Sequence, residues 1–340
     1  MSDTVRWGIL GVAKIAVNKV IPATQASAGS TVAAIASRDI EKARAAAREL
    51  SIPKAYGSYE ELIADKEIDA IYNPLPNHLH VPWTVKAAEA GKHVLCEKPI
   101  ALSAAEAREL LAVRDRTGVR IEEAFMVRTH PQWLAVRDMV KSGRIGDLRS
   151  IMGFFSYFNR DPENIRNVPE WGGGGLMDIG CYLINTSRFI FGKEPIRVFG
   201  LLEADPDYGV DRLGSLMLDF SSGQCIGSFG TQLVHFQRVN IFGTKGRIEL
   251  EIPFNAPSDR PSRIYVDPCS DLSGNGIELI EVPAADQYAI QAAMFSKAIR
   301  EGGDLAVSLE DSINNMAVID AVSRSASSGK WETPESGLPA

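Results

Sequence analysis

Two segments of the sequence combine residue types that can move protons. Lys98 follows a short apolar run and precedes a proline, and farther along Asp178 and Tyr182 are four positions apart. On a helix, that spacing places the carboxylate and the phenol on one face. Oxidation of a secondary alcohol requires a group that accepts the hydroxyl proton, and a tyrosine or lysine with a lowered pKa can do so. These residues therefore predict acid–base chemistry on a hydroxyl or carbonyl group.

The roles within this set can be divided in more than one way. Tyr182 or Lys98 could transfer the proton, and the sequence leaves both possibilities open. Asp178 would orient a substrate hydroxyl or Lys98. Taken singly, Tyr182 fits a core tyrosine and Asp178 fits the first turn of a helix, where the dipole favours a carboxylate. The four glycines at 172–175 predict a mobile backbone that can lie close to a ligand.

A glycine turn near the N-terminus predicts a nucleotide site. The apolar run Val5–Leu10 leads into Gly11, and a helix is expected directly after it. A tight turn at glycine and the unpaired N–H groups of a helix N-terminus suit a pyrophosphate, although a plain strand-to-helix turn also fits this segment alone. Ala13 replaces the usual second glycine, and Ala16 is small enough for close packing. The expected cofactor contacts here are Gly11, Val12, Ala13, Lys14 and Ile15.

The end of the second expected strand indicates which dinucleotide is bound. NAD sites place an acidic residue there for the ribose 2′-hydroxyl. This chain has Ser37 and Arg38, with Lys42 one turn into the next helix. A hydroxyl and two cations suit a 2′-phosphate, so NADP is favoured over NAD. Asp39 is expected to cap the helix that follows.

The first part of the chain must form the elements that position these residues. Short apolar runs at 5–10, 31–36, 70–73 and 93–97 alternate with amphipathic helices. This alternation predicts an α/β domain, a parallel sheet covered by helices on both faces. Lys98 would then lie at the carboxyl end of a strand, where open α/β sheets bind ligands. We expect residues 1–125 to form a Rossmann dinucleotide-binding domain.

The second part of the chain changes period. Longer runs alternate apolar and polar residues, and tight turns separate some of them, which predicts a large, open, mostly antiparallel sheet. The expected strands are 149–158, 196–204, 212–220, 224–231, 234–242 and 247–251. Residues 254–278 are rich in Pro, Ser and Asp and are expected to be irregular. We expect residues 126–340 to form an α+β domain whose last helix, near 309–327, packs back on the first domain.

Composition excludes several classes of protein. The chain of 340 residues is 45% hydrophobic and 23% charged, which is typical of a soluble globular protein. A net charge of −7 without a basic run excludes a nucleic-acid partner. Every apolar run is far shorter than the roughly 20 residues that span a bilayer. Scattered cysteines, histidines without ligand spacing and a start without a signal-peptide pattern predict no metal site and a cytoplasmic location.

Together the motifs resemble the glucose–fructose oxidoreductase and inositol dehydrogenase family, usually called Gfo/Idh/MocA. The matching segments lie within residues 5–190 and read RWGILGVAKIA, ASRDIEKA, KAYGSYEEL, NPLPNHLH, AGKHVLCEKPIAL and GGGGLMDIGCY. The resemblance implies a Rossmann domain followed by a domain with an open sheet. One face of that sheet would hold substrate against the nicotinamide and would supply the contacts of a homodimer or homotetramer.

The resemblance also implies roles for individual residues. Lys98 matches the lysine of the family's EKP motif, and Asp178 and Tyr182 match its DxxxY/H motif. Tyrosine in place of histidine is similar to the branch that contains glucose–fructose oxidoreductase, pentose dehydrogenase and dihydrodiol dehydrogenase. The implied activity is NADP-dependent hydride transfer with a sugar or polyol. The alternatives are a non-sugar substrate, such as a trans-dihydrodiol or a dicarbonyl, and a non-catalytic regulator that senses the cofactor.

Further contacts follow from the same resemblance. Those implied for the cofactor are Leu75, Asn77, His80, Glu97 and Lys98. Arg128 would contact the cofactor or bridge the two domains. The candidate substrate contacts are Arg166 and Trp171, before the glycine run, together with Asp178 and Tyr182.

Overall fold

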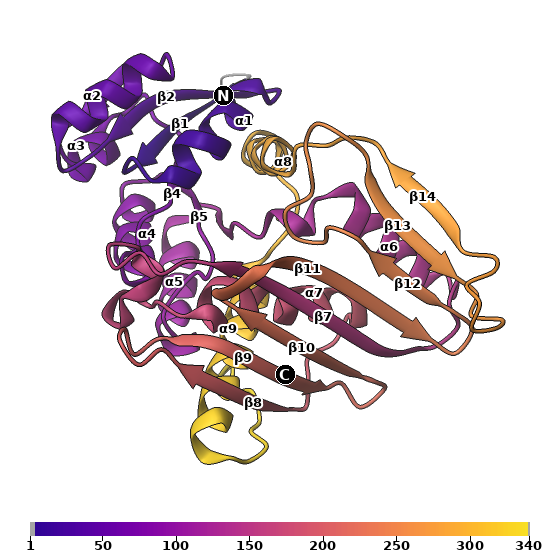
Figure 1. Ribbon diagram of the computed structural model, residues 1–340. Helices are drawn as coiled ribbons and strands as arrows, with labels where there is room; N and C mark the ends of the chain where they lie inside the picture. Colours follow the sequence, from indigo (N-terminus) through magenta and orange to yellow (C-terminus); the bar gives the residue numbers. More distant parts are fainter. Residues whose placement is uncertain (1–3, 339–340) are drawn as a thin grey trace. The chain divides into compact units, whose positions relative to one another are not determined.

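The chain folds into two units, each with its own sheet (Figure 1). The structure, a computed structural model, describes residues 4–338. Unit 1 contains residues 4–126 and 287–313, and unit 2 contains residues 127–286 and 314–338.

Unit 1 is built on a six-stranded parallel sheet with the strand order β3-β2-β1-β4-β5-β6. The strands are β1 (Val5–Leu10), β2 (Ser30–Ala36), β3 (Lys54–Tyr56), β4 (Ala70–Asn73), β5 (His93–Cys96) and β6 (Ile121–Glu123). This order confirms the predicted Rossmann fold, in which ligands bind where the order reverses, beside β1 and β4. The edge strands β3 and β6 were not predicted, because three residues are too few to show a periodicity.

The helices of unit 1 differ at their starts, and three of them begin at a side-chain cap. They are α1 (Ile21–Ala26), α2 (Ile40–Glu49), α3 (Tyr59–Ala64), α4 (His80–Glu89), α5 (Ala104–Thr117) and α8 (Gln287–Glu301), with short turns η1 (Ala16–Val20), η2 (Asn77–Leu79) and η3 (Met126–Arg128), the last spanning both units. Asp39 accepts hydrogen bonds from the first turn of α2, as predicted. Ser58 and Ser103 do the same for α3 and α5, which satisfies N–H groups that helices leave unpaired.

Helix α8 belongs to unit 1 although it lies late in the sequence. Phe295 packs against Trp7 of β1, with ring centroids 5.5 Å apart, and Trp7 Nε1 donates to Ser296 Oγ at 3.1 Å. Both aromatic side chains are fully buried in the core beside β1 and β2. From the sequence, a return to the first domain was expected for the last helix. That helix, α9 (Leu309–Ser328), begins in unit 1 and continues into unit 2.

Unit 2 is built on an eight-stranded sheet with the order β14-β13-β12-β11-β7-β10-β9-β8. The strands are β7 (Leu148–Phe158), β8 (Arg197–Ala204), β9 (Asp211–Asp219), β10 (Gln224–Gly230), β11 (Gln232–Gly243), β12 (Arg247–Leu250), β13 (Ser262–Asp267) and β14 (Glu278–Val282). Only β7 and β10 pair in parallel, so the predicted mostly antiparallel sheet is confirmed.

The expectation of an irregular segment at 254–278 was wrong. Strand β13 lies inside it and pairs with β12 and β14. Ser262, Ile264 and Val266 alternate toward the interior, as a half-buried strand requires. Proline, serine and aspartate on either side dominate the composition of this stretch and obscured an alternation only six residues long.

One face of the unit 2 sheet packs on helices. α7 (Cys181–Phe191) lies over β7, where a Cβ on Gly153 would approach Leu183 Cδ2 to 2.5 Å. α9 reaches β8, where Ser325 Oγ accepts from Gly200 N at 3.0 Å. α6 (Pro131–Lys141) packs beside α7 and β13.

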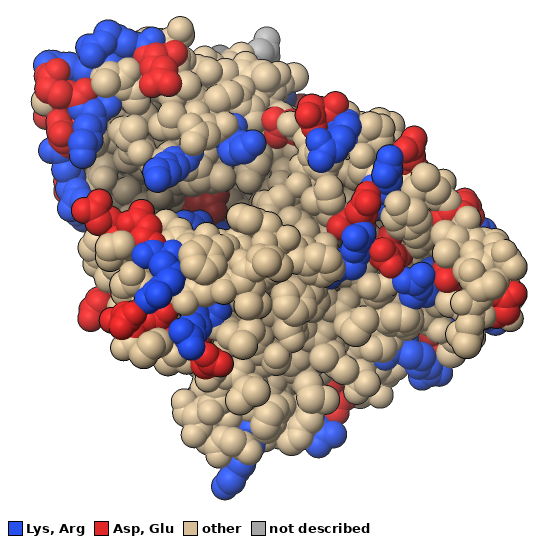
Figure 2. All heavy atoms as spheres, in the orientation of Figure 1, with Lys and Arg blue, Asp and Glu red and all other residues tan. Residues whose placement is uncertain are grey.

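The other face carries exposed apolar side chains in register. Met152 of β7 pairs with Ile226 of β10, which pairs with Met217 of β9 and then Phe199 of β8. Met152 and Ile226 are 51% and 40% exposed. Figure 2 shows a broad area over these strands with few charged side chains. Large exposed apolar patches are typical of interaction surfaces.

Neither a membrane span nor a metal centre is found in the part of the chain that the structure describes. Among residues 4–338, no helix combines the length and apolar character needed to cross a membrane. Over the same residues, no group of three or more His, Cys, Asp or Glu side chains is placed to hold a metal ion. The four cysteines are free thiols, and only Cys269 is exposed.

Candidate functional site

The turn after β1 has the geometry that the sequence predicted. Gly11 has a φ of +82°, and its N–H donates to Ala36 O at 2.8 Å. A Cβ at this position would lie 3.1 Å from Leu75 Cδ2, so both the backbone angle and the space favour glycine. Helical hydrogen bonding begins with Val17 N to Ala13 O at 3.0 Å. The helix N-terminus therefore opens directly beyond the glycine, as an anion site requires.

The end of β2 presents cations and uses its acidic residue elsewhere. Asp39 Oδ1 accepts from Glu41 N at 3.0 Å and Lys42 N at 3.3 Å, which makes Asp39 the predicted cap. Ser37 Oγ accepts from Asp39 N at 3.2 Å. Arg38 and Lys42 are exposed. The carboxylate that could compete for a ribose hydroxyl thus stabilises α2 instead.

Tyr59 is a neighbour of this region that the sequence analysis missed. Burial raises the pKa of its hydroxyl, and the nearby positive charge of Arg38 opposes that shift. The hydroxyl lies 3.6 Å from the position that a Cβ would take on Gly11. Tyr59 therefore stands between the glycine turn and Arg38. No local pattern in the sequence indicates this contact.

The loops after β4 and β5 are joined by buried polar side chains. His80 Nε2 lies 2.7 Å from Leu75 O, and His80 Nδ1 lies 2.7 Å from Pro99 O. Asn73 Oδ1 accepts from Leu75 N at 3.3 Å. Burial lowers the pKa of His80, and the two carbonyl acceptors, which favour a ring protonated on both nitrogens, oppose this shift. The imidazole thus contacts the backbone of both loops, while Asn77 is only partly buried at the start of η2.

Lys98 lies where the sequence placed it, two residues beyond the end of β5. Glu97 Oε1 accepts from Tyr72 Oη at 2.6 Å, and Glu97 Oε2 accepts from Lys98 N at 3.2 Å. Burial, followed by the charge of Glu97, raises the pKa of Tyr72 well above its ordinary value. The Lys98–Pro99 peptide bond is cis. Glu97 thus holds the backbone N–H of Lys98, whose side chain is half-buried.

In unit 2, Asp178 is the centre of a hydrogen-bonded group. Its Oδ2 accepts from Tyr157 Oη at 2.6 Å and pairs with Arg166 Nε at 2.7 Å. The side chain of Asp178 is 12% exposed and that of Arg166 is 40% exposed. The negative charge of Asp178 raises the pKa of Arg166, and burial raises the pKa of Tyr157. Asp178 is thus a fixed anion that holds a partly exposed cation.

Tyr157 was not predicted, although it contacts a predicted residue. It lies near the end of β7, within an aromatic run that indicates a strand packed on a core. Only the tertiary structure brings this position to Asp178, twenty-one residues later. A pattern of apolar alternation carries no information on which strand residue meets a particular helix.

Tyr182 fits both of its interpretations from the sequence, as a core tyrosine and as a residue of the candidate site. It is 5% exposed, and its ring packs at 5.8 Å from Phe155 and 5.6 Å from Phe254, measured between centroids. It also interacts electrostatically with Arg166. The aromatic cluster fixes the ring of Tyr182. Arg166 interacts with both Asp178 and Tyr182.

The helix that carries Asp178 and Tyr182 begins with a wide turn. Asp178 lies in η6 (Leu176–Gly180), a π-helical turn in which Cys181 N donates to Leu176 O. Tyr182 lies in the first turn of α7, which continues directly from η6. The predicted helical placement is confirmed. Turns of this kind are rare and occur often at functional sites.

The other predicted residues of unit 2 lie near this helix or on the turns before it. The Arg128 guanidinium lies 4.5 Å from the ring centroid of Phe189 on α7. Arg166 lies in η4 (Ile165–Asn167). Trp171 ends η5 (Pro169–Trp171) and is partly exposed.

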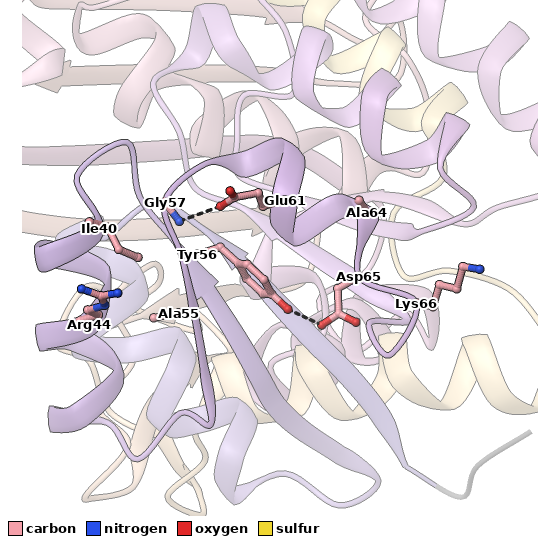
Figure 3. Close-up of a pocket in the computed structure, with 9 residues that line it drawn as sticks. All are labelled: Ile40, Arg44, Ala55, Tyr56, Gly57, Glu61, Ala64, Asp65 and Lys66. Carbon is pink, nitrogen blue, oxygen red and sulfur yellow. Dashed lines mark hydrogen bonds between the residues drawn. The ribbon is translucent and has the colours of Figure 1, made fainter.

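A surface cavity of about 860 Å³ in unit 1 is separate from all of these residues (Figure 3). Its lining comes from α2, β3 and α3 and comprises Ile40, Arg44, Ala55, Tyr56, Gly57, Glu61, Ala64, Asp65 and Lys66. Tyr56 Oη donates to Asp65 at 2.8 Å, and Glu61 accepts from Gly57 N at 3.0 Å. None of the predicted cofactor or substrate residues lines it.

Comparison with known proteins gives matches over most of the chain. Residues 5–125 match the family model for the NAD-binding Rossmann fold of the Gfo/Idh/MocA oxidoreductases, and residues 133–249 match the model for a Gfo/Idh/MocA C-terminal domain. An uncharacterized oxidoreductase, ORF334 of Rhizobium meliloti, is 51% identical, covering 97% of this chain and 99% of that protein. D-xylose 1-dehydrogenase (NADP(+)) 2 of Haloferax volcanii is 39% identical, covering 95% and 98%.

A solved structure agrees with these matches. KijD10, a 3-ketoreductase from Actinomadura kijaniata in complex with NADP and TDP-benzene, superimposes with a TM-score of 0.89 and is 30% identical. The comparison covers 95% of this chain and 98% of KijD10.

The hydrogen bond from Tyr157 to Asp178 generates a stability prediction. Tyr157→Phe leaves a largely buried carboxylate oxygen short of one donor and should lower the free energy of unfolding by about 1.5–3 kcal/mol. Denaturant unfolding measures this loss. Tyr208→Phe is the matched control, because the Tyr208 hydroxyl donates to Arg160 O in an exposed bond. Equal effects of the two substitutions would contradict the special role of Tyr157.

Proposed function

This chain belongs to the Gfo/Idh/MocA oxidoreductase family, and from that premise we propose that it transfers a hydride between NADP(H) and a sugar or polyol. Unit 1 would bind the cofactor and unit 2 the substrate. The observation that carries the proposal is the Asp178 carboxylate, which anchors Arg166 next to Tyr182. A sensing protein without catalysis has no need of this acid–base set.

Several features of unit 1 support NADP(H) as the cofactor. Arg38 and Lys42 are exposed cations at the end of β2, and Asp39 is engaged as a helix cap. Arg38 and Lys42, together with Ser37, would hold the 2′-phosphate of the cofactor. The glycine turn, with Gly11, Val12, Ala13, Lys14 and Ile15, would bind the pyrophosphate. Leu75, Asn77, His80, Glu97, Lys98 and Arg128 complete the proposed cofactor set.

The residues of this chain would then handle the proton. Bound NADP(H) supplies or accepts the hydride. Tyr182 would exchange the hydroxyl proton of the substrate, because a nearby guanidinium favours the phenolate form. Asp178 would keep Arg166 in place for this purpose. Lys98 would polarise the substrate oxygen or transfer the proton itself. Trp171 and Arg166 would contact the sugar.

A substrate panel tests the proposed function. Absorbance at 340 nm would be followed with NADP or NADPH and with aldoses, polyols, keto sugars, trans-dihydrodiols and dicarbonyls. Turnover with sugars or polyols is the expected result. Turnover only with a dihydrodiol or dicarbonyl would assign the same chemistry to a non-sugar substrate. NADP binding without turnover on any compound would favour the regulator and reject the enzyme.

The position of Lys98 generates the first catalytic prediction. Lys98→Ala should lower kcat at least about a hundredfold, because a group that transfers a proton or polarises the reacting oxygen is lost. The dissociation constant for NADP, measured by fluorescence titration, should change little. Lys86→Ala is the control, since Lys86 pairs with Glu60 on the surface. Near-normal turnover in the Lys98 variant would exclude both proposed roles of this lysine.

The cations at the end of β2 generate a prediction on cofactor choice. Arg38→Ala should raise KM for NADP by about tenfold or more and leave KM for NAD nearly unchanged, because only NADP carries the 2′-phosphate. Steady-state kinetics with both cofactors measures the ratio. Arg44→Ala, on the same helix as Lys42, is the control because Arg44 pairs with Glu41. An equal rise in KM for NADP and for NAD would contradict the assignment of Arg38 to the 2′-phosphate.

The open sheet face of unit 2 supports a homodimer or homotetramer. Met152, Ile226 and Met217 form an exposed apolar row across paired strands. Burial of such a row against a second copy would remove apolar surface from water at a gain of roughly 25 cal/mol per Å². We propose this face as the contact between copies of the chain.

This contact predicts an effect of charge on oligomeric state. Ile226→Glu combined with Met152→Glu should convert the oligomer to monomers, because buried unpaired carboxylates would face each other. Light scattering coupled to size exclusion measures the mass. Leu272→Glu is the control, since Leu272 is fully exposed in the segment between β13 and β14. An unchanged mass in the double variant would place the contact elsewhere.

A further inference from the structure

The glycine run before the candidate helix packs against a buried carboxylate. Gly174 has a φ of +108°, and a Cβ there would overlap Asp211 Oδ1. A Cβ on Gly175 would lie 3.3 Å from Asp211 Oδ2. From the sequence, these glycines were expected to bring the backbone close to a ligand. In the structure, two of them bring it close to Asp211.

Asp211 fixes the start of the helix that carries the proposed catalytic residues. It is the first residue of β9, and its Oδ2 accepts from Leu176 N at 2.7 Å. Leu176 begins η6, two residues before Asp178. The N–H of Gly175 also interacts with the Asp211 carboxylate. A carboxylate is well suited to this place, because helix N-termini leave N–H groups unpaired.

The surroundings of Asp211 disfavour its ionised form. Burial raises the pKa of Asp211 to about 7, the N–H donors oppose this shift, and the charge of Asp178 adds to it. From β7, the Tyr157 hydroxyl interacts with the same carboxylate. The cation of η4, Arg166, is paired with Asp178.

Within residues 4–338, the other elements packed around Asp211 bring no unpaired cation to it. Phe229 of β10 packs against Gly175, where a Cβ would lie 3.2 Å from Phe229 Cδ2. The neighbouring Arg212 pairs with Glu203 of β8 at 2.6 Å. The ionised carboxylate is therefore held chiefly by backbone N–H groups.

We propose that Asp211 is a positioning residue, which in its ionised form holds the turn at Gly175 and Leu176 and so sets the orientation of Asp178 and Tyr182. This inference rests on the proposed function for its effect on turnover. An ionised carboxylate accepts through both oxygens, whereas a protonated one presents a donor on one side. Protonation of Asp211 therefore loosens the start of the helix.

The pH profile of kcat tests this role. In the native protein, kcat should fall as the pH drops through about 7, in line with the pKa of Asp211. Asp211→Asn keeps one acceptor oxygen but places an NH₂ where the second oxygen was. Its kcat should lie about tenfold below native above pH 8, the loss expected for one hydrogen bond to a charged group. The fall near pH 7 should be absent, and KM for NADP should be unchanged.

Two further variants complete this experiment. Asp219→Asn is the matched control, because Asp219 ends the same strand and pairs with Arg197 on the surface. It should retain the native profile. Gly174→Ala pushes on the carboxylate from the opposite side and should reproduce the loss of kcat with KM for NADP unchanged. A native profile in Asp211→Asn, or normal kcat in Gly174→Ala, would overturn the proposal.

A second readout does not depend on turnover. The folded-state pKa of Asp211, about 7, lies above the unfolded value of about 3.9, so the native protein loses stability as the pH rises between these values. Asp211→Asn has no such loss. The difference in Tm, variant minus native, should therefore grow from pH 4 to pH 7 and then stay constant.

The two readouts separate failure of the inference from failure of the proposed function. Absence of turnover with every substrate, together with a growing Tm difference, would reject the function and leave the buried carboxyl in place. A constant Tm difference would reject the inference whatever the turnover.

Discussion

Asp178 accepts from Tyr157 and pairs with Arg166 through a single carboxylate oxygen, and the candidate site of unit 2 is organised by these two contacts. They tie the end of β7, the turn η4 and the helix η6 to one anion. The Asp178 carboxylate pairs with the partly exposed guanidinium of Arg166. Charge-assisted hydrogen bonds of this length are among the stronger ones in proteins, and burial of the partners strengthens them further. The roles proposed for Tyr182 and Arg166 both depend on this anchor.

In unit 1, contacts with backbone groups hold several loops together, as the Asp178 carboxylate does in unit 2. His80 contacts the carbonyls of Leu75 and Pro99, so the loops after β4 and β5 are joined beside Lys98. Gly11 permits Leu75 to approach the turn after β1. Three loops at the carboxyl ends of parallel strands are thereby held together, which is where this fold places its ligands. Asp39 caps α2, and Arg38 is the charged side chain proposed to lie near the ribose.

The similar proteins act in both chemical directions by name: one is a xylose dehydrogenase and another a 3-ketoreductase. The residues proposed here suit either direction, because a group that takes a proton from a hydroxyl can return it to a carbonyl oxygen. Under the proposed function, the acid–base residues would set the reaction type, and the turns at Arg166 and Trp171 would contribute to the choice of substrate.

Periodicity, turn residues and motif spacing are local properties, and from them the sequence predicted the Rossmann fold, the mostly antiparallel second sheet, the cap at Asp39 and the helix with Asp178 and Tyr182. It missed β13, whose six residues are too few to stand out from their composition. Tyr157, Tyr59 and Asp211 emerged only from the tertiary structure. Each lies on a different element from the group that it contacts, and no local pattern states which strand meets which helix. Gly174 is an example: the sequence shows that this position is a glycine, but not that the Asp211 carboxylate leaves no room for a Cβ there.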